Sequence, residues 1–361
     1  MTSADAHPVP SCIVSGDASE AARAEAARHL RRSRKVVLTA HEKPDADGVG
    51  SALGLQAALR TLGIEARCAF PSPLPENLRF LPGAEAALVV EAGNPLPEDL
   101  RGADCVVALD SGAATRIGAL LPLAREADAF LNIDHHASNE GFGTHRWVDP
   151  SYAAVGVMAF EIVCELGLPL TRESCLGFYT ALVFDTGGFA FSNTDPRSHR
   201  MAAACLERGV KAEEVTARLH RSRSPASWAC AAEAAARLKA PGDGALAWIT
   251  VTREMLDRHG LDETRQPELV DIPVSLAATR IGFLLTELPG GRGVRVSLRS
   301  RCPVGVHHIA ARHGGGGHAR AAGMTLPGTL AEVEARVLQE TRAALGSWSK
   351  HHGGPLPPQD A

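Results

Sequence analysis

The stretch AFLNIDHHASN, residues 129–139, places an aspartate and two histidines directly after a short apolar run. The run AFLNI has the length and composition of a buried strand. Asp134, His135 and His136 therefore stand where that strand would end and the chain would turn. A polar loop would explain these residues singly, whereas a metal site would need partners elsewhere in the chain.

Similar apolar runs recur through the first half of the chain: KVVLTA (35–40), ARCAF (66–70), ALVV (87–90) and DCVVALD (104–110). Segments with helical periodicity separate several of them, as in the stretch from residue 50 to residue 62. Strands that alternate with helices predict an α/β fold, with a mainly parallel sheet and helices on both of its faces.

A second α/β pattern begins after PGDGA (241–245), and an Ala-rich helical stretch precedes it. The patterns predict four parts: an N-terminal parallel-sheet domain, a helical linker, a smaller C-terminal α/β domain and a disordered tail. We place them at residues 1–200, 201–243, 244–346 and 347–361.

The composition excludes several classes of protein. The net charge of −4 and the aromatic content of 4% argue against a protein that coats long nucleic acids, so any nucleotide partner should be short. No apolar run is long enough to span a bilayer, and the N-terminus lacks a secretion signal, so we expect a cytoplasmic protein without a membrane partner. The eight cysteines form no CxxC pair, which favours free thiols over a disulfide framework or a zinc site.

Candidate metal ligands follow four of the apolar segments. HEKPDAD supplies His41, Asp45 and Asp47, and the other segments end in Asp110, in the Asp134–His136 triplet, and in Asp185. Pro44 favours an extended segment, in which Asp45 and Asp47 would point to the same side. A single aspartate at a strand end is usually a turn residue, but four clusters at corresponding positions predict a shared site at the carboxyl edge of the sheet.

The ligand types indicate which metals fit. Carboxylates and imidazoles without thiolates suit Mn²⁺, Co²⁺, Fe²⁺ or Mg²⁺ better than structural zinc. Two histidines and four aspartates exceed what one ion needs. They suit a pair of ions about 4 Å apart, the arrangement used for phosphoryl hydrolysis.

These motifs carry a family resemblance. HEKPDADGVGS, ALDSG with Arg116 shortly after it, NIDHHASN and FDTGGF resemble the four motifs of the DHH phosphoesterases. VRVSLRSR (294–301) and GGGGHARAAG (314–323) resemble the DHH-associated C-terminal domain. Gly48 stands where many relatives carry Ala, which is a mild departure.

The resemblance implies a role for each residue of the metal site. His41 and Asp45 would bind the first metal, and Asp110 would bridge the two ions. The second metal would be bound by Asp47, His135 and Asp185. Asp134 would be an outer-sphere residue that supports the histidine ligand or its loop, and His136 would face the scissile phosphate. The implied cofactor is two Mn²⁺, with Co²⁺ or Mg²⁺ possible.

The C-terminal part has an unusual charge pattern. Residues 289–331 contain six arginines and no acidic residue, which favours an anion site over a solvated mixed surface. In VRVSLRS, Arg295, Ser297 and Arg299 alternate onto one face of a strand. The glycines at 314–317 would leave backbone N–H groups open to an anion. With the resemblance, the expected substrate-binding residues are Arg116, Arg295, Ser297, Arg299, Ser300, Gly315, Gly316, Gly317 and His318.

The resemblance implies an enzyme that hydrolyses short oligoribonucleotides, including dinucleotides such as pGpG or pApA, 3′-phosphoadenosine 5′-phosphate (PAP), or both. A cyclic-dinucleotide phosphodiesterase is an alternative, and relatives are often homodimers. A non-catalytic nucleotide-binding protein on the same fold would predict the loss of a metal ligand. His145, His199, His220 and His259 lack convergent partners in the sequence, and we interpret them as surface or structural residues.

Overall fold

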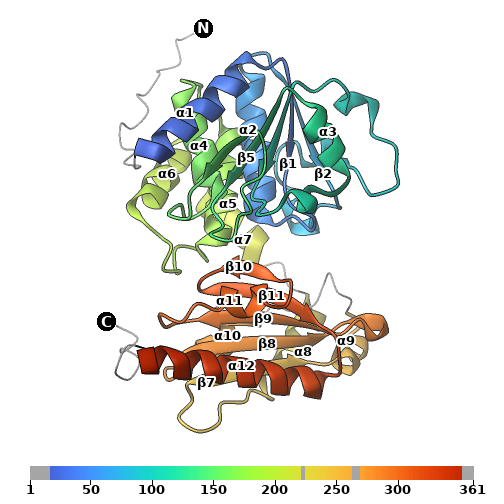
Figure 1. Ribbon diagram of the computed structural model, residues 1–361, viewed down its shortest axis with the longest axis vertical. Helices are drawn as coiled ribbons and strands as arrows, with labels where there is room; N and C mark the ends of the chain where they lie inside the picture. The colour runs from blue at the N-terminus through green and yellow to red at the C-terminus, as the bar shows by residue number, and fades with distance from the viewer. Residues whose placement is uncertain (1–16, 221–223, 262–268, 352–361) are drawn as a thin grey trace. The chain divides into compact units, whose positions relative to one another are not determined.

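The computed structural model describes residues 17–220, 224–261 and 269–351. The chain divides into two compact units, Met1–Ser222 and Arg223–Ala361, and each has its own sheet (Figure 1). The predicted α/β class, with a parallel sheet in the N-terminal part and a smaller second sheet, is confirmed.

The first sheet has six parallel strands in the order β3-β2-β1-β4-β5-β6. The strand order reverses between β1 and β4, which makes their carboxyl ends the place where an open parallel sheet binds ligands. The strands are β1 (Lys35–Thr39), β2 (Glu65–Phe70), β3 (Leu88–Val89), β4 (Cys105–Leu109), β5 (Ala129–Asp134) and β6 (His145–Val148).

Helices cover both faces of this sheet, with α3 on the side opposite α1 and α4 (Figure 1). Val36 and Leu38 point into the larger core and Val37 into the smaller one, so β1 is apolar on both faces. The helices are α1 (Asp17–Arg32), α2 (Ala46–Arg60), α3 (Leu121–Glu126), α4 (Val155–Glu165), α5 (Arg172–Asp185), α6 (Pro196–Glu207) and α7 (Ala212–His220).

Helix α2 starts earlier than the sequence indicated. Asp45 is its N-cap and accepts hydrogen bonds from the backbone N–H groups of Asp47 and Gly48. Asp47 therefore lies in the first helical turn, and the expectation of an extended segment through Asp47 is wrong. Asp45 is itself extended, with φ −99° and ψ −169°, and the helix starts directly after it because its carboxylate satisfies amide groups of the first turn.

Helices α2 and α5 pack through glycines. A Cβ at Gly50 would lie 2.4 Å from the carbonyl oxygen of Gly177, and a Cβ at Gly177 would lie 2.5 Å from that of Gly50. Only glycine allows the two backbones to approach so closely. This contact sets the position of α2, which begins beside Asp45, relative to α5, which ends at Asp185.

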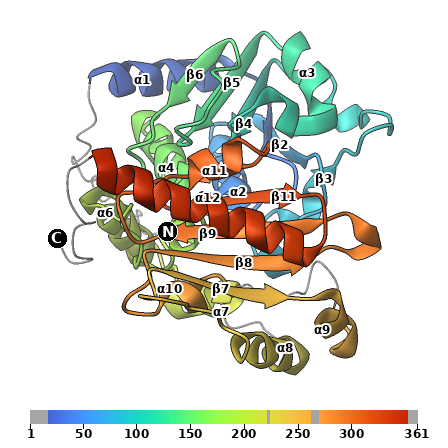
Figure 2. The same ribbon diagram turned by 60° about the horizontal axis from the view of Figure 1, so that its bottom comes forward.

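The second unit contains a five-stranded sheet in the order β10-β11-β9-β8-β7, in which only β7 and β8 are parallel. Its strands are β7 (Leu246–Val251), β8 (Ile281–Glu287), β9 (Val294–Ser300), β10 (Gly316–His318) and β11 (Ala321–Leu326). Helices α11 and α12 pack on one face, and α8, α9 and α10 on the other (Figure 2). Their bounds are α8 (Pro225–Ala235), α9 (Arg253–Arg258), α10 (Asp271–Val274), α11 (His307–Ala311) and α12 (Leu330–His351).

The expected linker and tail differ from the structure. Residues 201–243 do not form a separate part, because α6 buries Met201 and Cys205 in the first core whereas α8 buries Cys230 and Ala234 in the second. Residues 347–351 belong to α12, and Trp348 packs against the second core. The rest of the tail, 352–361, lies outside the described residues.

The composition predicted free thiols and no membrane-spanning segment. All seven cysteines in the described ranges are free thiols, and Cys12 lies outside those ranges. Among the described helices, none combines the length and the apolar character that crossing a bilayer demands.

Candidate metal centre

The structure brings the predicted ligands together at the carboxyl edge of the first sheet. His41 follows β1 and Asp110 follows β4, so these two residues flank the point where the strand order reverses. His135 follows β5. Asp47 comes from the first turn of α2, and Asp185 is the last residue of α5.

One group of possible ligands consists of His41, Asp45 and Asp110. The Nε2 atom of His41 lies 3.7 Å from Asp45 Oδ2 and 3.5 Å from Asp110 Oδ2. The other ring nitrogen, Nδ1, lies 2.8 Å from the carbonyl oxygen of Glu42. A hydrogen bond from Nδ1 to that carbonyl orients the ring and leaves Nε2 directed at the carboxylates.

The second group consists of Asp47, His135 and Asp185. The Nε2 atom of His135 lies 3.2 Å from Asp185 Oδ2 and 3.6 Å from Asp47 Oδ2. Its Nδ1 atom is 3.0 Å from the carbonyl oxygen of Tyr152. The two histidines are therefore oriented in the same way, each by a backbone carbonyl behind the ring.

Asp110 lies between the two groups. Its Oδ2 atom approaches His41, and its Oδ1 atom lies 3.7 Å from Nε2 of His135. The backbone of Asp110 has φ +54°, a left-handed conformation that is uncommon outside glycine and that aspartate tolerates better than most residues. This backbone strain is a feature of functional sites, and here it accompanies a carboxylate placed between two imidazoles.

Asp134 and His136 form a pair of their own. His136 Nδ1 donates to Asp134 Oδ1 over 2.7 Å, and Asn139 Nδ2 donates to Asp134 Oδ2 over 2.6 Å. Asp134 therefore supports His136 and the loop, not the ligand His135. Burial acts to lower the pKa of His136, but the bond to Asp134 and the surrounding carboxylates outweigh it and raise the pKa to about 9.

The electrostatics of the centre favour bound cations. Burial and the charges of Asp110 and Asp45 raise the pKa of Asp47 well above its ordinary value, and burial and Asp47 do the same to Asp185. Within each group of three, all ligand atoms lie within 4.8 Å of one another. Crowded, buried carboxylates of this kind require positive charge for ionisation, and oxygen-rich sets with imidazole fit a divalent transition-metal ion.

Several supporting groups were not identified from the sequence. The Asp47 carboxylate accepts hydrogen bonds from the N–H groups of Val155 (2.7 Å) and Gly156 (2.9 Å) at the start of α4 and from Ser51 Oγ (3.1 Å). The contacts with Val155 and Gly156 span more than 100 residues of sequence, so no local pattern could have indicated them. Asn139, by contrast, lies within the quoted motif, and its side chain could have been suspected there.

Four of the predicted phosphate-binding residues, Arg295, Ser297, Arg299 and His318, lie on one face of the second sheet. Ala321 of β11 pairs with Arg299 of β9 on one side and with His318 of β10 on the other. Arg299 and His318 therefore lie on the same face of the sheet, together with Ser297 and Arg295. All three β9 residues are half-buried and alternate with a buried apolar set. The Arg299 Nε atom is buried without a hydrogen-bond partner in the described part of the chain, and this leaves a donor for an anion.

Other predicted substrate residues are placed differently. Ser300 lies on the opposite, buried face of β9, and its hydroxyl donates to the Cys302 carbonyl at 3.0 Å, so it does not join Arg299. Gly316 and Gly317 belong to the hairpin of β10 and β11, not to an open loop, and a Cβ at Gly315 or Gly317 would strike the β11 backbone. Arg116 lies in the first unit, and its carbonyl accepts from the Glu42 N–H at 2.7 Å.

The other four arginines of residues 289–331 have structural contacts, and Arg292 donates to the Pro289 carbonyl at 3.1 Å. Arg301 donates to the carbonyl of Val274 at 2.8 Å, and Arg320 donates to that of Cys302. Arg312 pairs with Glu340 of α12 at 2.7 Å. Of the six arginines, Arg295 and Arg299 of β9 therefore remain as the expected anion ligands.

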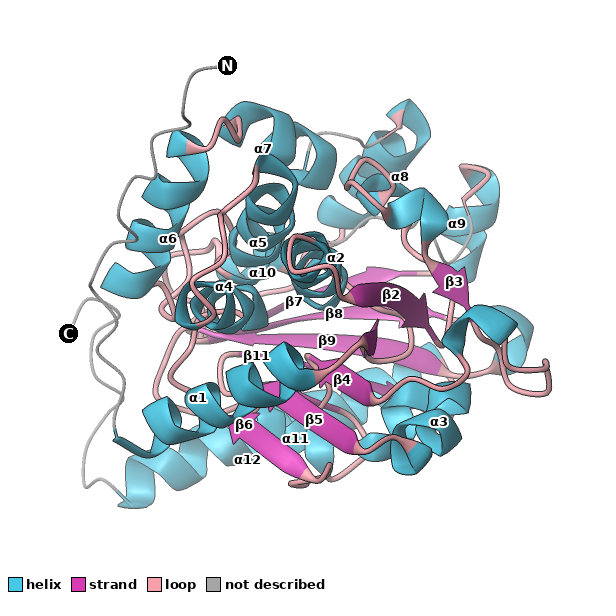
Figure 3. Cartoon of the chain, turned by 90° about the horizontal axis from the view of Figure 1, so that it is seen from above, coloured by secondary structure: helices cyan, strands magenta, loops and turns pink. Residues whose placement is uncertain are grey.

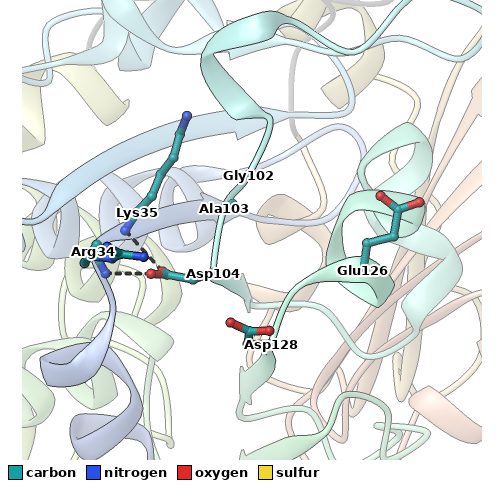
Figure 4. A pocket seen from close by; sticks show the side chains of 7 residues that line it. All are labelled: Arg34, Lys35, Gly102, Ala103, Asp104, Glu126 and Asp128. Carbon is teal, nitrogen blue, oxygen red and sulfur yellow. Dashed lines mark hydrogen bonds between the residues drawn. The ribbon is translucent and has the colours of Figure 1, made fainter.

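A hollow at the opposite edge of the first sheet has a different character. It lies at the amino ends of the strands, where the Asp104 carboxylate accepts hydrogen bonds from the N–H groups of Arg34 (2.8 Å) and Lys35 (3.1 Å), as Figure 4 shows. Glu126 and Asp128 also line it. Since open α/β sheets bind ligands at the carboxyl ends, we do not assign the reaction to this hollow.

The chain resembles known proteins along most of its length. Residues 35–181 match the DHH family, N-terminal domain, and residues 250–348 match the DHHA1 domain. The bifunctional oligoribonuclease and PAP phosphatase NrnA of Thermus thermophilus is 35% identical over 312 residues, which cover 86% of this chain and 90% of that protein. The protein of the same name from Bacillus subtilis is 26% identical over 311 residues, covering 81% and 89% of the two chains.

Among solved structures, an exopolyphosphatase-related protein from Bacteroides fragilis shares the fold, with a TM-score of 0.81 and 23% identity over 92% of this chain and 97% of that one. The fold and the matched regions define a phosphoester-bond hydrolase built on a parallel α/β sheet. The chain belongs to the DHH family of phosphoesterases and carries the associated DHHA1 domain.

Proposed function

We propose that this protein hydrolyses short oligoribonucleotides to mononucleotides and PAP to AMP, with two divalent cations as cofactors. The observation that carries the proposal is the pair of ligand groups at the reversal point of the sheet, where Asp110 belongs to one group and lies 3.7 Å from His135 of the other. The names of the relatives from Thermus thermophilus and Bacillus subtilis support the same pair of substrates.

His41 and Asp45 would hold one ion. The other ion would be held by His135, Asp47 and Asp185, and Asp110 would bind both ions. Bound there, two such ions activate water for attack on phosphorus and stabilise the charge that develops on its oxygens. The set of carboxylates and imidazoles suits Mn²⁺, with Co²⁺ or Mg²⁺ as alternatives.

His136 would supply a proton or a hydrogen bond beside the metals. Its Nδ1–H is held by Asp134 Oδ1, and Nε2–H is the donor that would meet a phosphate or leaving-group oxygen. Against the effect of burial, the hydrogen bond to Asp134 raises the pKa of His136, which favours the protonated ring that can offer that hydrogen. Asp134 acts as its positioning residue, and Asn139 holds Asp134 in turn.

Substrate phosphate would bind to Arg295, Ser297, Arg299 and His318 on the open face of β9 and β10. Guanidinium groups bind phosphate oxygens in a bidentate manner, and Arg299 has an unpaired Nε–H for this purpose. The same chemistry would accept a cyclic dinucleotide, which remains the second candidate substrate. A purely binding role is disfavoured because all six ligand positions are occupied by metal-binding side chains.

The test is hydrolysis by protein stripped with a chelator and then supplied with Mn²⁺. The substrates are a 5′-phosphorylated dinucleotide, PAP, cyclic di-AMP and an RNA of about two dozen nucleotides. We expect fast turnover of the dinucleotide and PAP, slow turnover of the RNA, and no turnover without added metal.

The control compares Asp110→Asn with Asp128→Asn, an exposed aspartate at the amino end of β5. Asp110→Asn should lose activity by about 10³-fold or more, because it removes a group that both ions would share. Asp128→Asn should stay active. Equal activity of the two variants would contradict the proposed centre, and preference for the long RNA would contradict the short-substrate assignment.

A further inference from the structure

A separate group of possible metal ligands, outside the candidate metal centre, lies on the outer edge of the first unit. Glu25 and His29 of α1 and His145 of β6 place their ligand atoms within 4.8 Å of one another. The Nδ1 atom of His145 is 2.8 Å from Glu25 Oε1, and the rings of His29 and His145 have centroids 3.8 Å apart. The sequence interpretation of His145 as a residue without convergent partners is therefore wrong.

The placement follows from element geometry. Glu25 and His29 are four residues apart, so both lie on the same face of α1. His145 is the first residue of β6, the edge strand, and α1 runs along this strand (Figure 3). The contact between α1 and β6 is also polar at its other end. There Ser19 accepts a hydrogen bond from Trp147 Nε1 and donates one to Asp149, each at 2.8 Å.

We propose that Glu25, His29 and His145 form a second, peripheral binding site for a divalent metal ion of the Zn²⁺ type. Two imidazoles and one carboxylate are the protein ligands of a tetrahedral zinc site in which water takes the fourth position. This set has more nitrogen than the catalytic centre, so it favours Zn²⁺ over Mn²⁺.

The exposure of the three side chains and the charge state of His29 both favour metal binding. All three residues are half-buried, so their heads are accessible to an ion from solvent. Burial and the neighbouring His145 lower the pKa of His29, which keeps its ring neutral, and a neutral imidazole is the form that binds metal. By contrast, His259 and His313 each meet a single glutamate, at 3.0 and 2.7 Å, with no second imidazole in either pair.

An ion here would join α1 to the edge strand. β6 leads to Asp149 and Tyr152, and the Tyr152 carbonyl orients the ligand His135. Because an ion that binds only the folded state stabilises it, Zn²⁺ should raise the melting temperature of this unit. The site would be structural and separate from the reaction.

The experiment counts Zn²⁺ bound per chain by equilibrium dialysis of the full-length protein and of His29→Gln, His145→Gln and His259→Gln. We expect the first two variants to bind one Zn²⁺ fewer than the parent and to lose the site's share of the Zn²⁺-induced rise in melting temperature. His259→Gln is the matched control and should bind as the parent does. Anomalous scattering at the zinc edge from a Zn²⁺-soaked crystal should give a peak between the three side chains.

Equal Zn²⁺ counts in all four proteins, or no anomalous peak at this position, would overturn the proposal. Circular dichroism melting of the metal-free proteins checks folding without relying on activity. If His145→Gln does not fold, the Zn²⁺ count of His29→Gln alone still tests the proposal. His29 is half-buried on α1, so its substitution should not prevent folding. The Zn²⁺ count does not depend on hydrolysis, so this test and that of the proposed function can fail separately.

Discussion

Asp134, His135 and His136 are consecutive residues, yet each has different contacts. His135 points at Asp47, Asp110 and Asp185, whereas His136 is held by Asp134. We therefore propose that His135 binds metal and that His136 meets the substrate. Asp134, the last residue of β5, orients the ring of His136 and is tied to the loop by Asn139.

This division predicts separable kinetic effects. His136→Gln should lower kcat by about 10²–10⁴-fold, because it removes a proton donor, while the Mn²⁺ concentration needed for half-activation stays the same. Asp134→Asn should lower kcat by about 10–100-fold, as expected for a residue that positions another. Mn²⁺ titrations of hydrolysis at saturating dinucleotide measure both quantities.

His135→Gln is the contrasting variant, and it should raise the Mn²⁺ requirement. If Asp134→Asn behaved like His135→Gln, with normal kcat at high Mn²⁺, then Asp134 would serve the metal ligand and our assignment of it to His136 would be wrong.

At the scale of elements, the contact of α2 with α5 sets the distance between Asp47 and Asp185. Gly50 and Gly177 permit this contact, since a side chain at either would overlap the opposite backbone. The close approach is a property of two helices more than 100 residues apart in the chain, so it serves the site only in the folded state.

Gly177→Ala should destabilise the protein by about 1–3 kcal/mol or more, because the added methyl has no space to occupy. Gly346→Ala in α12 is the matched control, since nothing lies within 4 Å of a Cβ placed there. This control should be neutral or stabilising by up to about 1 kcal/mol, as expected for glycine in a helix interior. Denaturant unfolding measures both; equal effects would argue against backbone contact as the cause.

Helix α6 offers a pH-dependent test. Asp195 is its N-cap, accepts from the Ser198 N–H at 2.8 Å and pairs with Arg197 at 2.7 Å. Burial opposes ionisation, but these contacts outweigh it and hold the pKa of Asp195 below its ordinary value of 3.8. A lowered carboxyl pKa contributes stability above that value, and the contribution is lost as the pH falls through the lower, folded-state pKa.

Asp195→Ala should therefore lower stability at pH 7 by about 0.5–2 kcal/mol, the usual effect of losing an N-cap. Asp195→Asn keeps a cap acceptor but not the charge, so its deficit should be smaller and should shrink as the pH falls below about 4. Melting temperatures of the three proteins across pH 3 to 7 provide the measurement. A constant deficit for Asp195→Asn would exclude the charge as its cause.

At the scale of the whole molecule, the metal ligands and the phosphate-binding arginines belong to different units. We propose that the metal ligands carry out the hydrolysis and that the arginines bind a phosphate of the nucleotide, so the two sets of residues can be tested separately. Arg299→Ala should raise KM for the dinucleotide by about 10–100-fold, since a charge-assisted hydrogen bond is worth about 1.5–3 kcal/mol. Its kcat/KM for bis(p-nitrophenyl) phosphate should stay unchanged.

Arg312→Gln is the control for loss of charge, because Arg312 already pairs with Glu340. It should leave KM for the dinucleotide nearly unchanged. A fall in small-ester hydrolysis by Arg299→Ala would indicate general damage and would contradict a role confined to substrate binding.

The sequence by itself determined the α/β class, the parallel strands and the identity of the six metal-ligand candidates. Apolar periodicity reports which residues face a core, and ligand types at strand ends report where a parallel sheet presents them. These signals are local, so they can be recognised without knowledge of the fold. The helical start after Asp45 was missed because an N-cap aspartate is itself extended, so the sequence there also suits the continuation of an extended segment.

Only the tertiary structure decided which side chains support which ligands. The amides of Val155 and Gly156 that hold Asp47, the Tyr152 carbonyl behind His135, and the meeting of Glu25 and His29 with His145 join distant segments. It also divided the expected linker between two cores and moved Ser300 away from Arg299. Such contacts depend on how helices and strands pack, and packing is set by the shapes of surfaces that a linear pattern does not record.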